Sequence, residues 1–261
     1  MVSRTFGWFL LAVPVLLAVA GPLIAGPAVS VGVPWQPPDA AHPLGTDVLG
    51  RDALTVILTG GLPMIGMTGA ALGLAYLVGV PLGLFAAGRG RWADEAVMRS
   101  LDLVLAFPSL LVLMVLAATG HRGPGVLVPA VAALQLTAIT RVVRAAALAP
   151  GCRTAVEALT LQGRPWWRIQ LGYVARYVTG PVATDAGTRL GVVLYLLASA
   201  NFLGLGLPAD SPDWAVVIER NSEALYTAPA VVLVPAALLM ALCVGTNLVT
   251  DRLLAARWVS L

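Results

Sequence analysis

Residues 62–87 read LPMIGMTGAALGLAYLVGVPLGLFAA, an apolar stretch that contains no Asp, Glu, Lys or Arg. An α-helix needs about 20 predominantly apolar residues to cross the hydrocarbon core of a bilayer. The Gly and Pro residues in this stretch are tolerated where neighbouring helices satisfy the backbone and small residues permit close helix approach. The stretch therefore predicts a membrane-spanning helix in a packed bundle.

The composition of the whole chain agrees with a membrane location. Of its 261 residues, 59% are hydrophobic and 11% are charged, and the mean hydropathy is +0.88. A soluble domain carries roughly 25% charged residues. So few charges could not cover the surface of a soluble globule of this size. The composition therefore excludes an ordinary soluble enzyme and indicates an integral membrane protein.

Other segments of the chain have a similar length and apolarity. Together they predict six transmembrane helices, at residues 8–28, 62–87, 101–119, 126–143, 178–200 and 229–249. The first segment also fits a cleaved signal peptide, because Arg4 precedes it and small residues fill its end. We prefer a retained first span. The expected fold is thus all-α, with six helices in the membrane.

The arginines predict the orientation of these spans. With the N-terminus in the cytoplasm, 12 arginines fall in cytoplasmic segments or at the cytoplasmic end of a span, 3 fall in external segments, and Arg189 falls inside a span. Cytoplasmic loops of membrane proteins are enriched in Lys and Arg. Both termini are therefore predicted to be cytoplasmic. The cytoplasmic set is Arg4, Arg89, Arg91, Arg99, Arg141, Arg144, Arg153, Arg164, Arg168, Arg176, Arg252 and Arg257, and the external set is Arg51, Arg122 and Arg220.

The predicted spans divide the chain into two parts. Residues 1–61 hold the first helix and an extracytoplasmic segment, and residues 62–261 hold a five-helix core with a cytoplasmic loop at 144–177 and an extracytoplasmic loop at 201–228. Neither loop has the roughly 100 residues that a nucleotide-binding or catalytic domain needs. All 16 basic residues are Arg, so a P-loop, which requires Lys, is absent. Any energy must therefore come from a partner or an ion gradient.

The polar residues form no recognisable catalytic or metal-binding pattern. No Ser/His/Asp or paired-carboxylate arrangement is evident, and His42 and His121 lack metal-ligand spacing. Cys152 lies in a polar loop and Cys243 in an apolar span, which argues against a disulfide. The arginines are scattered, so nucleic-acid binding is not expected. We expect no catalytic residue, no metal site and no cofactor in this chain.

The cytoplasmic loop is predicted to form two short helices. Gly163 can end the first helix in the left-handed conformation, and Pro165 suits the first turn of the second. Ala158 would let another protein approach closely, and Glu157 would offer it a polar contact. The alternative is an amphipathic connector on the lipid headgroups, with the Trp-Trp-Arg run at 166–168 in the interface. Chemistry alone leaves both possibilities open.

The same loop carries a pattern that resembles a known motif. Glu157-Ala158-Leu159, followed by Gly163, is similar to the EAA motif of binding-protein-dependent ABC importer permeases, although Leu159 stands where that motif has a second Ala. In that family a short cytoplasmic coupling helix carries the motif and docks on an ATPase subunit. The resemblance implies this set of ATPase-coupling residues: Arg153, Glu157, Ala158, Gly163 and Arg164.

Three further blocks narrow the resemblance. Residues 42–52 (HPLGTDVLGRD), 94–108 (DEAVMRSLDLVLAFP) and 201–214 (NFLGLGLPADSPDW) look like blocks of the second permease subunit of dipeptide and oligopeptide importers. The resemblance runs from about His42 to the C-terminus. It implies the type I ABC importer permease fold and a multi-pass location in a bacterial inner (plasma) membrane.

The resemblance also implies a set of partners. A homologous second permease would enclose the pathway, two cytoplasmic ATPase subunits or domains would bind ATP and Mg²⁺, and an extracytoplasmic binding protein would deliver the cargo. The cargo stays open between dipeptides, oligopeptides and other small solutes such as metal chelates or glutathione. The alternative function is a self-sufficient secondary transporter, which predicts inverted repeats and several midplane carboxylates. Away from the ends of the predicted spans, Asp185 is the one carboxylate that we place within a span.

The second external segment predicts a surface for the binding protein. Residues 202–226 begin Gly-rich and continue as a plausible amphipathic helix. Such a helix would present residues to a protein docked above the pathway, or it would simply cap the bundle. The candidate docking residues are Asp213, Trp214 and Glu219.

Three local patterns predict contacts within the bundle. Asp185 and Arg189 are spaced i, i+4 in the fifth span, where an unpaired charge would cost at least about 2.5 kcal/mol, so we expect them to pair. The pair is either a structural salt bridge or part of the pathway. Asp52 is predicted to cap a helix lying along the outer face before the second span. Phe107-Pro108 is predicted to kink the third span.

Overall fold

The computed structural model describes residues 4–30, 32–120 and 122–259, so His121 lies outside the described residues. Within these ranges the chain is helical, with isolated bridges but no longer strand. The long helices, together with the shorter α4 that follows α3, are α1 (Arg4–Ile24), α2 (Ala53–Gly88), α3 (Arg91–Leu105), α4 (Ser109–Ala118), α5 (Pro124–Ala147), α9 (Thr179–Phe202) and α11 (Pro229–Val259). The short ones are α6 (Pro150–Leu161), α7 (Trp166–Arg168), a π-helix (Ile169–Val174), α8 (Ala175–Tyr177), α10 (Trp214–Arg220) and a 3₁₀ helix (Ser222–Tyr226).

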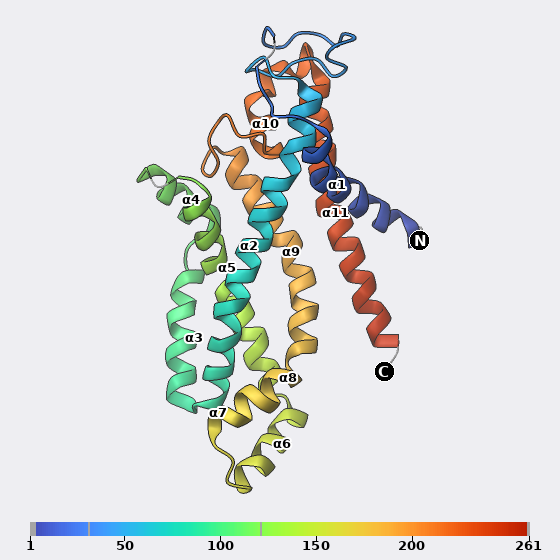
Figure 1. Ribbon diagram of the computed structural model, residues 1–261. Coiled ribbons are helices and arrows are strands. Elements are labelled where there is room, and N and C mark those ends of the chain that lie inside the picture. Colours follow the sequence, from blue (N-terminus) through green and yellow to red (C-terminus); the bar gives the residue numbers. More distant parts are fainter. Residues whose placement is uncertain (1–3, 31, 121, 260–261) are drawn as a thin grey trace.

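The helices confirm an all-α membrane fold, but their apolar lengths alone do not confirm six spans. Four described helices are long and apolar enough to cross a membrane: α1, α2, α5 and α11. The number is five if α3 and α4 count as one bent span. The predicted fifth span corresponds to α9, whose 24 residues have sufficient length but include Asp185 and Arg189. Its place in the bundle rests on packing, because α9 lies beside α2, α5 and α11 (Figure 1).

Two predicted boundaries were wrong near the first loop. The first helix ends at Ile24 rather than near residue 28, and α2 begins at Ala53, nine residues before the predicted span. Asp52 explains the early start, because its side chain accepts a hydrogen bond from Thr55 N at 2.9 Å and caps the helix. Asp52 therefore caps the spanning helix itself, not a separate helix on the outer face.

The predicted third span is broken rather than merely kinked. The axes of α3 and α4 differ by 67° across a gap that contains Phe107 and Pro108. Proline lacks an N–H group and its ring clashes with the preceding helical turn, so α3 ends before Pro108 and α4 starts at Ser109. The predicted site of the bend is therefore confirmed.

Glycines bring α5 against the backbone of α2. A Cβ at Gly83 would lie 2.6 Å from Val143 Cβ, and a Cβ at Gly79 would lie 2.8 Å from Ile139 Cγ2. The Thr140 hydroxyl donates to the Gly79 carbonyl at 3.3 Å. The small residues thus let the two helices pack at backbone distance, as is common between membrane helices.

Two other helix pairs complete the bundle. Figure 1 shows α1 and α11 side by side, and a Cβ at Gly245 would lie 2.5 Å from Leu11 N. Polar contacts join α3 to α5 instead. Arg141 pairs with Asp102 and Arg144 pairs with Asp94, so two ion pairs tie the helices along their length. The bundle therefore combines close glycine packing with a few directed polar contacts.

The close approach of α2 and α5 predicts the effect of adding one methyl group. Gly83→Ala should lower the stability by about 2 kcal/mol, because a Cβ there overlaps Val143 and Thr140 O. Gly73→Ala is the matched control, since nothing lies within 4 Å of a Cβ at this position of the same helix. Thermal unfolding of the purified protein in detergent measures both. Equal melting temperatures for the two variants would contradict the packing.

Candidate functional site

The segment from residue 150 to 177, here named the hairpin, projects from one end of the bundle. Figure 1 shows α6 and α7 at the lower end, beyond α3 and α9. Gly163 has φ 73°, the left-handed value that favours glycine, and Pro165 immediately precedes α7. The predicted order of helix, glycine break and second helix is therefore present, with α7 continuing through a π-helix and α8 toward α9.

The hairpin exposes every residue that the sequence assigned to coupling. Arg153 Nε donates to Glu157 Oε1 at 3.0 Å, and both side chains are mostly exposed. Leu161 is 91% exposed at the end of α6, a feature that the sequence analysis missed. A single exposed Leu needs no explanation, but here it lies close to polar residues that a partner could bind. The exposed set is Arg153, Glu157, Ala158, Gly163 and Arg164.

The base of the hairpin is built into the core. The buried side chains of Cys152 and Ile169 pack in the same cluster as Val143 of α5. A small cavity of about 210 Å³ lies between Arg153, Glu157 and the ends of α2 and α5. A displacement of the hairpin would therefore be passed directly to α5.

Trp166 connects the hairpin to the end of α2. The Arg89 guanidinium lies 4.6 Å from the centre of the Trp166 ring, and Phe85 contacts the ring edge-on at 6.4 Å between centroids. A Cβ at Gly88 would overlap Trp166, so this glycine permits the contact. Trp167 is 53% exposed. The alternative interpretation places both tryptophans among the lipid headgroups. The structure instead packs Trp166 against Arg89 and Phe85 of this chain.

A polar network crosses the middle of the bundle. Arg189 Nε donates to Asp185 Oδ2 at 2.6 Å, which confirms the predicted pair. The Tyr76 hydroxyl of α2 donates to the same oxygen at 2.6 Å, and Arg189 Nη1 donates to Gln135 Oε1 of α5 at 3.0 Å. The sequence analysis missed Tyr76 and Gln135, because their partners are far along the chain. The network joins α2, α5 and α9, which satisfies both charges within the protein.

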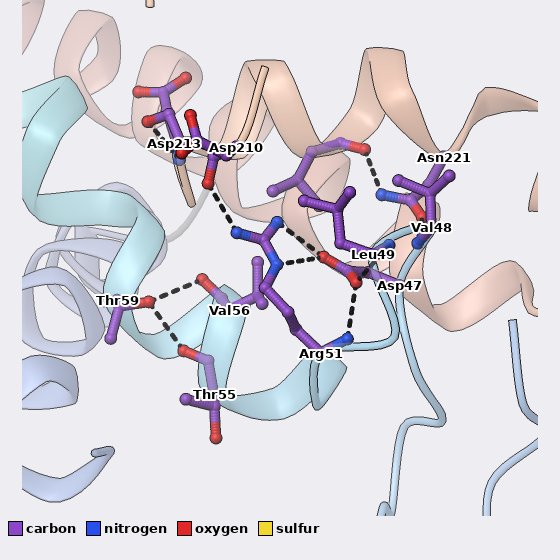
Figure 2. Close-up of polar contacts among 12 residues, drawn as sticks. Asp47, Val48, Leu49, Arg51, Thr55, Val56, Thr59, Asp210, Asp213 and Asn221 are labelled. Atoms are coloured by element: carbon purple, nitrogen blue, oxygen red, sulfur yellow. Dashed lines mark hydrogen bonds and ion pairs between the residues drawn. The ribbon is translucent and has the colours of Figure 1, made fainter. Parts of the chain in front are cut away.

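The opposite end of the bundle carries what we name the cap, residues 29–52 and 203–228. Its centre is the buried ion pair of Asp47 and Arg51, whose Nη2 and Oδ2 atoms are 2.6 Å apart (Figure 2). Arg51 Nη1 also donates to the Asp210 carbonyl at 2.6 Å. The pair therefore fastens the first cap segment to the second, although the two lie far apart in the sequence.

Asn221 makes a second connection between the cap segments. Its Oδ1 accepts a hydrogen bond from Val48 N at 2.8 Å, and its Nδ2 donates to Val217 O at 2.8 Å (Figure 2). The side chain is 1% exposed, so these bonds are shielded from water. Because the Asn221 amide bonds to one backbone group in each cap segment, it fixes how the two segments are aligned.

Trp214 seats the cap on α2. Its Nε1 donates to the Ile57 carbonyl at 2.7 Å, and its ring lies where side chains at Gly60 and Gly61 would otherwise be. Asp213 caps α10 by accepting from Ala215 N at 3.0 Å. Burial raises the pKa of the Asp213 carboxyl to about 6.

Asp213 and Trp214 are both 0% exposed. This burial contradicts a direct docking contact by either residue, because their side chains are committed to the interior. The third candidate, Glu219, is half-buried and lines a cavity beside the cap. The amphipathic helix is also shorter than expected, since α10 ends at Arg220 and a 3₁₀ helix follows.

The sequence of this chain matches a family of known membrane proteins. Residues 79–258 match the family model described as "Binding-protein-dependent transport system inner membrane component". The chain belongs to this family. It is accordingly a multi-pass membrane component of a transport system, which agrees with the helical bundle described above.

Several relatives in the family have named activities. The dipeptide transport system permease protein DppC of Alkalihalophilus pseudofirmus is 30% identical over 243 residues, covering 92% of this chain and 80% of that protein. The glutathione transport system permease protein GsiD of Pectobacterium atrosepticum is 29% identical and covers 83% and 72%. The probable D,D-dipeptide transport system permease protein DdpC of Escherichia coli is 29% identical and covers 82% and 72%.

A solved structure supports the fold. A chain of the MetNI methionine ABC transporter, in a structure of its inward-facing conformations, superposes with a TM-score of 0.62 and 16% identity. The match covers 77% of this chain and 95% of that one. At this identity the likeness shows a shared fold and nothing more.

The network around Asp185 predicts non-additive mutations. Asp185→Ala and Arg189→Ala should each lower stability by about 3 kcal/mol, because each leaves the other charge buried and unpaired. The double variant should be less destabilised than the sum of the two, by at least about 1 kcal/mol. Thermal unfolding of all four proteins of the cycle measures this coupling. Strictly additive losses would argue against the pair as a stabilising contact.

Proposed function

We propose that this chain is one of two homologous permease subunits of an ATP-driven importer for dipeptides and other short peptides. Family membership and the named relatives support the transport function and the class of cargo. The two permeases would enclose the pathway, and an extracytoplasmic binding protein would deliver peptide to it. The chain would perform no covalent chemistry, so its task is to change shape.

The hairpin carries the proposal for energy coupling. It presents Glu157, Ala158 and Leu161 to a partner, while its base is packed into the helix bundle. A partner that moves the exposed side therefore moves the bundle, which suits a rigid-body change between two states. Two cytoplasmic ATPase subunits or domains would bind ATP and Mg²⁺ and dock at this hairpin.

The distribution of arginines supports the orientation. By the enrichment of arginine in cytoplasmic segments, the hairpin and both termini would lie in the cytoplasm and the cap outside. In this orientation the cap faces the binding protein, with Glu219 as the remaining candidate contact. A secondary transporter is disfavoured, because the family membership implies separate partners and the buried charges are satisfied within the bundle.

A bulky residue on the hairpin should uncouple the importer. Ala158→Trp is expected to lower uptake and binding-protein-stimulated ATP hydrolysis about tenfold, since a loss of 1.4 kcal/mol at the docking contact has that effect. Basal hydrolysis should stay within about twofold of wild type, because the ATPases are unchanged. Reconstituted vesicles containing the complete transporter provide both measurements.

Two variants make the coupling test specific. Ala96→Trp introduces the same change at an exposed site on α3 and should leave stimulation intact. Trp167→Ala should also have little effect, whereas the headgroup alternative predicts a strong loss. Full stimulation in Ala158→Trp, or loss in Ala96→Trp alone, would overturn the coupling role of the hairpin.

Cysteine labelling tests the orientation. In a background with Cys152→Ala and Cys243→Ala, Thr160→Cys and Ala40→Cys introduce single thiols at exposed positions of the hairpin and the cap. A membrane-impermeant maleimide added to intact cells should label Ala40→Cys and should label Thr160→Cys only after permeabilisation. The reverse pattern would invert the proposed topology.

A further inference from the structure

A cavity of about 440 Å³ lies beside the cap. Its walls come from the link between α4 and α5, the segment after α9, and the last turn of α10. Figure 1 shows the first two links on the same side of the bundle. The volume lies within the range of about 300–1,000 Å³ that small-ligand sites occupy.

The lining of this cavity favours a carboxylate. Arg122 and Arg220 both line it, and neither forms an ion pair within the part of the chain that the structure describes. Arg122 Nε makes a long hydrogen bond, 3.5 Å, to Ala117 O. Arginine side chains recognise carboxylates through paired N–H donors. Two such side chains at one cavity therefore favour an anionic group there, and neither of them is held in an ion pair by a described acid.

The N-terminus of α5 adds to this preference. Gly123 lines the cavity at the N-terminus of α5, a 24-residue helix that has no side-chain cap, so the positive end of its dipole lies at the cavity wall. Asn201 also lines it, is 1% exposed, and has no hydrogen-bond partner for Nδ2 among the described residues, although it lies near enough to Asp213 to lower the pKa of that carboxyl. The Asn201 amide therefore faces the Asp213 carboxyl, and the donors left for an anion are the two guanidinium groups and the N-terminus of α5.

The cavity lining also contains one negatively charged side chain. Glu219 lines it next to Arg220, so a ligand would meet a carboxylate as well as two guanidinium groups. Gly123 and Gly204 leave the wall open, since nothing lies within 4 Å of a Cβ at either position. A small molecule with one carboxylate and one ammonium group matches this arrangement, and a short peptide with free ends is such a molecule.

We propose that the cavity binds a short zwitterionic peptide, with Arg122 and Arg220 holding its free α-carboxylate and Glu219 facing its α-ammonium group. The inference rests on the proposed function, which makes peptides the cargo and places the cap outside. The site would then hold peptide as it passes from the binding protein to the pathway. An acidic loop of the binding protein is the competing occupant, but its docking would require a broad surface rather than a cavity of this size.

The test measures peptide binding to the complete transporter in detergent, without the binding protein. Saturation-transfer NMR titrations of Ala-Ala and Ala-Ala-Ala give Kd values for wild type and variants. Replacing the terminal carboxylate with an amide should weaken binding about tenfold, the value of one charged hydrogen-bonded contact. Arg122→Gln and Arg220→Gln should each weaken Ala-Ala by a similar factor and abolish the preference for the free carboxylate.

Controls separate this site from general charge effects. Arg176→Gln removes one exposed arginine at the hairpin end and should leave the Kd unchanged. Glu219→Gln should reduce the discrimination against N-acetyl-Ala-Ala while keeping the preference for a carboxylate over an amide. Melting temperatures equal to wild type within about 2 °C show that each variant is folded, since 1 kcal/mol shifts a domain of this size by roughly that amount.

Several outcomes would overturn the proposal. Equal binding of Ala-Ala and its amide, or unchanged Kd values in both arginine variants, would remove the carboxylate site. Unchanged peptide binding combined with lost stimulation by the binding protein would assign the arginines to protein docking instead. In either case, uptake by wild-type vesicles would leave the importer function standing, whereas absent uptake with intact Ala-Ala binding would contradict the importer alone.

Discussion

The fold depends on how closely other elements approach the backbone of α2. Five glycines make this possible: Gly60, Gly61, Gly79, Gly83 and Gly88. The first two admit the cap through Trp214, the next two admit α5, and the last admits the hairpin through Trp166. At 1.5 Å per residue, the 36 residues of α2 span roughly 54 Å, well beyond the ~30 Å hydrocarbon core. One continuous helix therefore touches the cap, the middle of the bundle and the hairpin.

This arrangement explains which parts of the fold the sequence could predict. Apolar length located α1, α2, α5, α9 and α11, because the bilayer imposes that length on each span separately, but it missed most of α3, which is rich in polar residues. It failed at the start of α2 and at the break between α3 and α4, where capping and proline decide the boundary. It also overestimated how apolar α9 is, since the charges of that helix are tolerated through contacts made by other helices. Contacts distant in the sequence cannot be inferred from one segment alone.

The candidate sites likewise divide into features that local sequence predicts and features that depend on distant contacts. Asp52, Gly163 and the Asp185 and Arg189 pair act over four residues or fewer, and spacing alone was enough to predict them. The Arg51 contact with Asp210 joins two loops across most of the chain, so no local pattern indicates it. The burial of Trp214 was missed for a related reason, because its place depends on glycines in another helix. An amphipathic pattern predicted a surface helix where the structure has a buried anchor.

The ion pair in α9 has a consequence for how the protein enters the membrane. A charged side chain at the centre of a helix raises the free-energy cost of membrane insertion by about 2.5–3.5 kcal/mol. We therefore expect α9 to insert poorly into the bilayer unless other helices are already there. The groups that bond to its charges, Tyr76 and Gln135, belong to helices synthesised earlier. By the time α9 emerges, α2 and α5 can already offer it a polar surface inside the bilayer. The order of helices along the chain is thus also a workable order of assembly, in which the early spans act as an internal chaperone for the late one.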